Sequence, residues 1–134
     1  MKTVLFACVH NTGRSQMAEA FFNRLADPRK ARAVSGGTEP ASGMNATVVA
    51  VMKELGIDLI EQGHHPKLAD LDGLKAGDRA ISMGCGVNLA CPVKLGSMED
   101  WGLADPKDQS VERVREIRDA IRQRVEVLVK ELGA

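Results

Sequence analysis

A short loop near the start of the chain lies between an apolar run and an amphipathic stretch. Residues 3–7 (TVLFA) predict a buried parallel strand, and residues 15–22 predict the start of a helix. In a strand-loop-helix unit of this kind, the loop amides and the unpaired amides of the first helical turn point at one place, which favours an anion. The sequence therefore predicts a cradle for a tetrahedral oxyanion over residues 8–15.

Two side chains of this loop are suited to chemistry on such an anion. Cys8 stands where the strand ends, so its sulfur would lie beneath the anion's central atom. Arg14 could grip two of the anion's oxygens with its planar guanidinium. The amide dipoles and Arg14 favour the thiolate form of Cys8, which is the nucleophilic form. The alternative is that Cys8 is a small buried hydrophobe at a strand end.

The loop resembles the phosphate-binding loop of low-molecular-weight protein tyrosine phosphatases and of the arsenate reductases that share their fold. The continuation Gln16-Met17-Ala18-Glu19 is similar to the arsenate reductase branch in particular. The resemblance implies that Ser15 donates a hydrogen bond to the Cys8 sulfur and that Asn11 holds the loop in shape. It also implies that the oxyanion is bound by the whole loop, that is by Val9, His10, Asn11, Thr12, Gly13 and Arg14.

The rest of the chain alternates predicted strands and helices. Strands are expected at residues 31–35, 79–83 and within 93–101, and helices at 15–25, 44–55 and 110–132, with a short surface helix at 67–74. This order indicates one α/β domain over residues 1–134, with a doubly wound sheet of about four parallel strands and helices packed around it. The strand at 79–83 would then deliver Gly84 and Cys85 to the same sheet edge as Cys8.

Composition excludes several classes of partner. The net charge is zero, with 18 basic and 18 acidic residues, and the aromatic residues are Phe6, Phe21, Phe22 and Trp101. Nucleic acid is therefore not expected as a partner, because the chain offers neither a basic stripe nor a stacking platform. No apolar run is long enough for a membrane span and no secretory signal is present, so we expect a cytoplasmic protein.

The dipeptide Asp105-Pro106 resembles the general acid of the same family, which protonates the departing oxygen. The alternative is a turn aspartate before proline. Tyrosine phosphatases of this family usually carry an aromatic residue after the Asp-Pro pair and a second cysteine inside the loop. This chain has Lys107 and Gly13 at those places. The pattern therefore favours arsenate over a phosphotyrosine ester.

Three cysteines are better explained in a reducing compartment by redox chemistry than by a structural framework. The resemblance implies that Cys85 attacks the Cys8 sulfur after arsenate has bound there, and that Cys91 then attacks Cys85. A thioredoxin or a similar dithiol would restore the reduced enzyme. The alternatives for Cys85 and Cys91 are inert thiols or half of a zinc site, although their spacing exceeds the usual short metal hook.

Some relatives bind a potassium ion near Asn11, Glu19 and Ser35, and no tightly bound cofactor is expected otherwise. This chain has no further acidic residue around positions 64–67, where His64 or Lys67 could take the place of a ligand. The adjacent histidines at 64 and 65 are expected in a solvated loop, because neighbouring side chains point in different directions and cannot share a metal.

The expected function is reduction of arsenate to arsenite, with phosphate or sulfate as analogues of the substrate and with residual phosphatase activity. A second hypothesis is a phosphatase that uses Cys8, Arg14 and Asp105 alone. A third is a sensor that binds oxyanions without turning them over.

Overall fold

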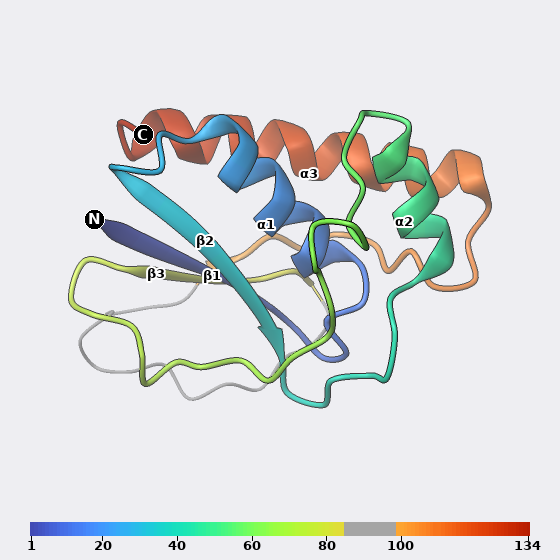
Figure 1. The fold of residues 1–134 in the computed structure, drawn as a ribbon, viewed down its shortest axis with the longest axis horizontal. Coiled ribbons are helices and arrows are strands. Elements are labelled where there is room, and N and C mark those ends of the chain that lie inside the picture. The colour runs from blue at the N-terminus through green and yellow to red at the C-terminus, as the bar shows by residue number, and fades with distance from the viewer. Residues whose placement is uncertain (85–98) are drawn as a thin grey trace.

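The computed structural model describes residues 1–84 and 99–134, and the predicted resolving thiols Cys85 and Cys91 lie outside these residues. The described residues form one four-stranded sheet with the order β2-β1-β3-β4 (Figure 1). Its strands are β1 (Lys2–Cys8), β2 (Ala31–Gly37), β3 (Arg79–Ser82) and β4 (Glu99–Asp100). All three neighbouring pairs are parallel, which confirms the predicted α/β class and the four-stranded parallel sheet.

The helices α1 (Arg14–Leu25), α2 (Ala46–Lys53) and α3 (Val111–Glu131) lie together on one side of the sheet (Figure 1). Residues of β1 alternate between the two faces, as a strand requires. Val4 and Phe6 belong to the main core under the helices, whereas Leu5 packs with Leu74 and Ala80 in a second, smaller cluster. The central strand is therefore buried on both faces, in agreement with its continuous apolar sequence.

The long C-terminal helix follows the predicted pattern closely. Its inward stripe is buried and consists of Val114, Ile117, Ile121, Val125 and Leu128. The side chain of Ser110 accepts a hydrogen bond from the amide of Arg113, and Glu112 lies in the first turn, where it favours the positive end of the helix dipole. Val111 was expected in the stripe but is 42% exposed.

The two shorter helices differ from expectation at their ends. Helix α1 begins at Arg14, one residue earlier than predicted, and its expected core residue Leu25 is 42% exposed. Helix α2 is shorter than the predicted range, because the side chain of Asn45 caps it by accepting from the amide of Val48. Gly56 follows the helix with a φ of 78°, a conformation that glycine adopts at no steric cost.

The prediction of a surface helix at residues 67–74 is wrong. Leu68 instead forms a parallel bridge with Gly37, and the Gly37 backbone exchanges hydrogen bonds with Lys67 and Ala69. Residues 67–69 therefore run in an extended conformation beside the end of β2. A Cβ at Gly36 would lie 2.4 Å from the Cα of Ala69, so this close approach requires glycine.

The carboxyl ends of β1 and β3 meet at one edge of the sheet. The amide of Met83, one residue after β3, donates to the carbonyl of Ala7 at 3.2 Å. Gly84 thus reaches the same edge as Cys8, as the sequence predicts for parallel strands. Of the strand expected within residues 93–101, the described part is β4.

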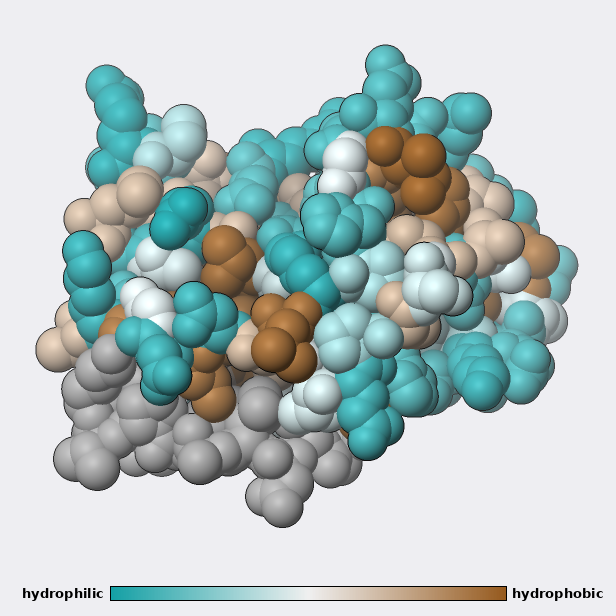
Figure 2. Space-filling model, turned by 60° about the horizontal axis from the view of Figure 1, so that its bottom comes forward, coloured by the Kyte–Doolittle hydropathy of each residue, from teal (hydrophilic) through white to brown (hydrophobic). Residues whose placement is uncertain are grey.

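The surface of the described residues carries no broad apolar face in the view of Figure 2, where apolar residues form small groups separated by polar ones. Among the same residues, none of the helices combines the length and apolar character that a membrane span needs. The apolar surface seen in this view is therefore of the scattered kind that ordinary folded domains show.

Two valines of α3 allow a matched test of the core. Val125 is fully buried, whereas Val127 on the same helix is 56% exposed. We expect Val125→Ala to lower the free energy of unfolding by about 2 kcal/mol, because it leaves a cavity that the core fills only in part. Val127→Ala should change it by less than about 0.5 kcal/mol. Urea unfolding of both variants measures the difference, and equal losses would contradict this packing of α3.

Candidate active site

A cavity of about 460 Å³ opens at the carboxyl edge of the sheet. Cys8 and the loop residues that follow it form one wall, while Gly84 and residues 103–107 form the other. The predicted oxyanion-binding residues Val9, His10, Thr12, Gly13 and Arg14 all line this cavity. Segments far apart in the sequence therefore meet at the end of β1, where parallel sheets commonly place their ligands.

Arg14 joins the two walls of the cavity. Its side chain is only 4% exposed, and its Nη1 atom donates to the carbonyl oxygens of Met83 at 2.9 Å and Leu103 at 2.6 Å. Its Nη2 atom lies 3.9 Å from the sulfur of Cys8 and 3.7 Å from Oδ2 of Asp105. The guanidinium thus holds the exits of β3 and β4 while its charge lies beside the candidate nucleophile.

One donor of this guanidinium is left over. Among the described residues, the buried Nε atom of Arg14 has no hydrogen-bond partner. An unmade hydrogen bond at a buried donor costs about 1–3 kcal/mol, and more when the group is charged. A tetrahedral oxyanion above Cys8 would bring acceptor oxygens to the guanidinium, so the donor set fits an anionic ligand.

Cys8 and Asp105 occupy very different environments in the cavity. Cys8 is 7% exposed at the bottom, whereas the side chain of Asp105 is 61% exposed at the rim. The Oδ1 atom of Asp105 accepts from the amide of Lys107 at 3.0 Å. The structure therefore brings together Cys8, Arg14 and Asp105, which the sequence predicts as nucleophile, cation and general acid.

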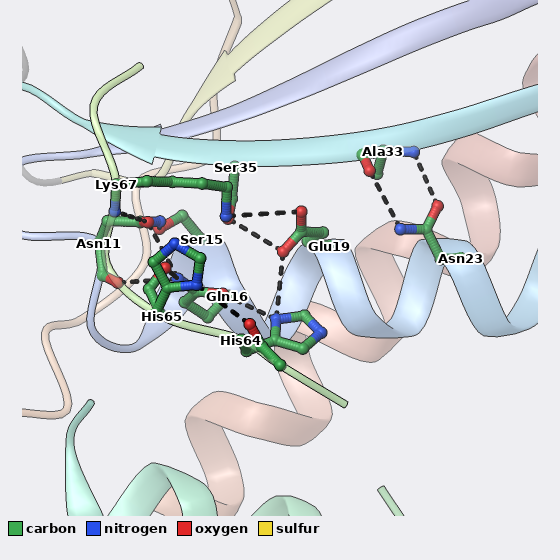
Figure 3. Close-up of polar contacts among 11 residues, drawn as sticks. Asn11, Ser15, Gln16, Glu19, Asn23, Ala33, Ser35, His64, His65 and Lys67 are labelled. Atoms are coloured by element: carbon green, nitrogen blue, oxygen red, sulfur yellow. Dashed lines mark hydrogen bonds and ion pairs between the residues drawn. The ribbon is translucent and has the colours of Figure 1, made fainter. Parts of the chain in front are cut away.

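Asn11 braces the loop from below and is fully buried (Figure 3). Its backbone has a φ of 57°, a left-handed conformation that is uncommon outside glycine. Its Oδ1 atom accepts from the amide of Lys67 at 3.0 Å and from Nε2 of Gln16 at 2.9 Å, and its Nδ2 atom donates to Oγ of Ser15 at 2.7 Å. These contacts agree with the expected bracing role, while donation by Ser15 to the Cys8 sulfur stays a prediction.

Behind Asn11 lies a buried carboxylate with several partners. Glu19 is 8% exposed, and its Oε2 atom accepts from Oγ of Ser35 at 3.1 Å and lies 3.2 Å from Nδ1 of His64 (Figure 3). Its Oε1 atom lies 3.8 Å from the Lys67 ammonium, which also donates to Ser35 at 3.4 Å. Burial raises the pKa of Glu19, but the hydrogen bond from His64 and the charge of Lys67 outweigh it and hold the pKa below its ordinary value.

The expectation of a solvated histidine loop is wrong for His64 and correct for His65. The side chain of His64 is 13% exposed, and its Nδ1 atom also lies 2.8 Å from Oε1 of Gln16. The available signal was the pair Gln16 and Glu19, which share one face of a helix and needed polar partners once buried. Among residues 1–84 and 99–134, no group of three or more His, Cys, Asp or Glu side chains could hold a metal ion.

The geometry agrees with a comparison against known protein families. A profile of the low-molecular-weight phosphotyrosine protein phosphatases matches residues 3–134. The chain belongs to this family. Within it, the chain is 38% identical to a glutaredoxin arsenate reductase of Synechocystis over 137 residues, which cover 99% of this chain and 100% of that protein.

Solved structures of the family agree with this similarity. One is an arsenate reductase in a phosphate-binding state, with a TM-score of 0.79, 38% identity and coverage of 98% of this chain and 99% of that chain. Another is a thioredoxin-dependent arsenate reductase from Corynebacterium glutamicum, with a TM-score of 0.77 and 33% identity. That match covers 99% of this chain and 62% of the longer Corynebacterium chain.

The buried carboxylate should make stability depend on pH. A glutamate whose pKa is depressed by folding contributes stability above its ordinary pKa, and this contribution is lost as the pH falls through the lower folded pKa. We therefore expect the free energy of unfolding to fall on acidification below about pH 4.5, and Glu19→Gln to weaken that dependence. Glu61→Gln, at an exposed position, is the control. Denaturant unfolding of the parent and both variants from pH 7 to pH 3 measures how the free energy of unfolding depends on pH. The same dependence in the parent and in Glu19→Gln would contradict the role of Glu19.

Proposed function

We propose that this member of the family reduces arsenate to arsenite, with Cys8 as the nucleophile and Cys85 and Cys91 as the thiols that carry the oxidation away. The observation that carries the proposal is the buried Cys8 beside Arg14, whose Nε donor lacks a partner among the described residues, in a cavity with Asp105 at its rim. The arsenate reductases among its relatives favour arsenic over phosphorus as the reacting centre.

The first step forms a bond between sulfur and arsenic. The Cys8 thiolate attacks arsenate, one arsenic–oxygen bond breaks, and the departing oxygen takes protons and leaves as water. Asp105 donates a proton to that oxygen from the rim, while Arg14 and the loop amides stabilise the charge on the remaining oxygens. The Nη2 atom of Arg14 lies 3.9 Å from the Cys8 sulfur, which favours the thiolate needed for attack.

The second step transfers the electrons. The Cys85 thiolate attacks the Cys8 sulfur, a disulfide bond forms, and the electron pair of the broken sulfur–arsenic bond stays on arsenic, which leaves as arsenite. Cys91 then attacks the Cys85 sulfur and releases Cys8 as a thiolate. An external dithiol finally reduces the Cys85–Cys91 disulfide to two thiols and becomes a disulfide itself.

The electron donor in this proposal is thioredoxin or a similar dithiol protein. The relatives point to two donor classes, because the Corynebacterium protein is thioredoxin-dependent and the Synechocystis protein is a glutaredoxin arsenate reductase. A reducing cytoplasm would supply either donor. We propose that residues 1–134 act there as a single catalytic domain.

A phosphatase is the second candidate function. Cys8, Arg14 and Asp105 share one cavity, and these three groups are sufficient for phosphate-ester hydrolysis without any further thiol. An oxyanion sensor would use the same cradle without turnover. Steady release of arsenite, dependent on the second thiol, distinguishes the reductase from both.

The cysteine series tests the proposed function. Arsenite production is measured with thioredoxin, thioredoxin reductase and NADPH, and in parallel with glutaredoxin and glutathione. We expect Cys8→Ser and Cys85→Ser to abolish turnover, and Cys91→Ser to lower the thioredoxin-coupled rate at least tenfold. Hydrolysis of an aryl phosphate by the same variants is the matched control reaction.

Hydrolysis of the ester should require Cys8 and survive both Cys85→Ser and Cys91→Ser. Full arsenite turnover by Cys85→Ser would overturn the reductase mechanism. Full thioredoxin-coupled turnover by Cys91→Ser would leave a two-thiol reductase and remove the third thiol from the proposal.

The potassium ion that some relatives bind does not fit the residues around Glu19 in this chain. The Lys67 ammonium lies 3.8 Å from Oε1 of Glu19 and donates to Ser35 at 3.4 Å, so a cation of the protein already occupies this position. We expect arsenite production at constant ionic strength to be equal within about twofold in KCl and NaCl. Lys67→Met should lower the rate in NaCl, because Glu19 then keeps a buried charge with less compensation. Several-fold activation of the parent by KCl would contradict this assignment.

A further inference from the structure

Asp100, at the end of β4, accepts hydrogen bonds from three donors in the two segments that leave β3 and β4. Its Oδ1 atom accepts from Oγ of Ser82 at 2.6 Å and from the amide of Gly84 at 2.9 Å. The amide of Gly102 also donates to its carboxylate. The hydroxyl of Ser82 contributes most to holding the pKa of Asp100 below its ordinary value, and the backbone amides and the charge of Arg14 contribute as well.

These contacts join the chain leaving β3 to the chain leaving β4. The register pairs Ser82 with Asp100, and the amide of Trp101 donates to the carbonyl of Ser82 at 2.9 Å. Arg14 binds the same two exits through the carbonyl oxygens of Met83 and Leu103. Asp100 and Arg14 therefore both fasten the exits of β3 and β4 to each other, one through amides and the other through carbonyls.

Both exits contain a glycine with a positive φ, and at Gly84 the two exits also pass too close together for a side chain. Gly84 has a φ of 82° and Gly102 has a φ of 58°. A Cβ at Gly84 would lie 2.6 Å from the amide nitrogen of Leu103. The position of Gly84 is thus set by a tight crossing with the exit of β4 and by the carboxylate of Asp100.

We propose that Asp100 is a positioning residue for the second step of the reduction, in which it fixes the point from which the chain brings Cys85 to the sulfur of Cys8. This inference rests on the proposed function, because Cys85 follows Gly84 directly in the sequence. Disulfide exchange requires a narrow range of sulfur positions, and a displacement of about 1 Å at a reacting group can cost a factor of 10² in rate. Asp100 itself touches neither the oxyanion nor a sulfur in this scheme.

In the step that Asp100 serves, the Cys85 thiolate forms a disulfide with Cys8 and the electron pair of the arsenic–sulfur bond reduces As(V) to As(III). This step needs no external thiol. A single turnover of reduced enzyme with excess arsenate therefore comprises this step and the attack by Cys8 that precedes it, without the final reduction by an external dithiol, and releases one arsenite for each enzyme. Hydrolysis of an aryl phosphate uses Cys8, Arg14 and Asp105 without Cys85, and serves as the matched reaction on the same molecules.

We expect Asp100→Ala to slow single-turnover arsenite release about tenfold while kcat for the aryl phosphate changes less than about threefold. Asp100→Asn keeps a carbonyl acceptor for Ser82 and Gly84 and should recover most of the rate. Ser82→Ala removes one donor to Oδ1, and its rate of single-turnover arsenite release should lie between those of Asp100→Ala and Asp100→Asn. Glu99→Gln, on the neighbouring exposed carboxylate of the same strand, should behave like the parent.

The outcomes separate this inference from the proposed function. If Cys85→Ser abolishes single-turnover release but Asp100→Ala keeps the parent rate or exceeds it, the positioning role is wrong and the reductase mechanism stands. If both reactions of Asp100→Ala fall by the same factor, Asp100 acts on the fold or on the oxyanion site as a whole, which also overturns the inference. If Cys85→Ser releases arsenite at the parent rate, the proposed function itself fails.

Discussion

The guanidinium of Arg14 is the interaction on which the arrangement of the cavity depends. It is nearly buried, yet its donors reach the exits of two strands and the vicinity of Cys8 and Asp105. A buried charge is costly unless its donors find acceptors, and the carbonyl oxygens of Met83 and Leu103 are the acceptors for Nη1 of this one. One side chain thus links the oxyanion loop to the two segments that supply the rest of the site.

The local pattern of apolar residues was sufficient to predict the strands and helices whose position is set by burial. The apolar run of β1 is buried on both faces, and the stripe of α3 from Val114 to Leu128 lies in the core. Likewise, the loop between β1 and α1 could be predicted as one wall of the cavity, because its residues are contiguous and a strand-loop-helix unit fixes where their amides point. The sequence therefore placed Cys8 and Arg14 in one predicted site, and the resemblance favoured Asp105 as the acid over a turn aspartate.

Contacts between distant segments could not be predicted in this way. The stretch at residues 67–74 has a helical pattern, but pairing of Leu68 with Gly37 competes with the helix and is preferred, because it satisfies the backbone at the end of β2. The burial of His64 depends on Glu19, a residue 45 positions earlier in the chain. In the same way, the contacts of Asp100 depend on the register that places it beside Ser82, and register is a property of the folded sheet.

The two walls of the cavity differ in a way that suits the proposed reaction, in which several sulfur atoms take part. The wall around Cys8 is rigidly built, since Asn11, Ser15 and Gln16 are fully buried and hydrogen-bonded to one another. The opposite wall carries its acid at the rim, with Asp105 61% exposed. In the proposed mechanism, a fixed Cys8 would keep the oxyanion in one position, and the exposed rim at Asp105 would leave access for arsenate and then for Cys85. Because a disulfide forms only when the two Cα atoms approach within about 7 Å, the proposed mechanism could not pass beyond the first bond to arsenic in a site enclosed on all sides.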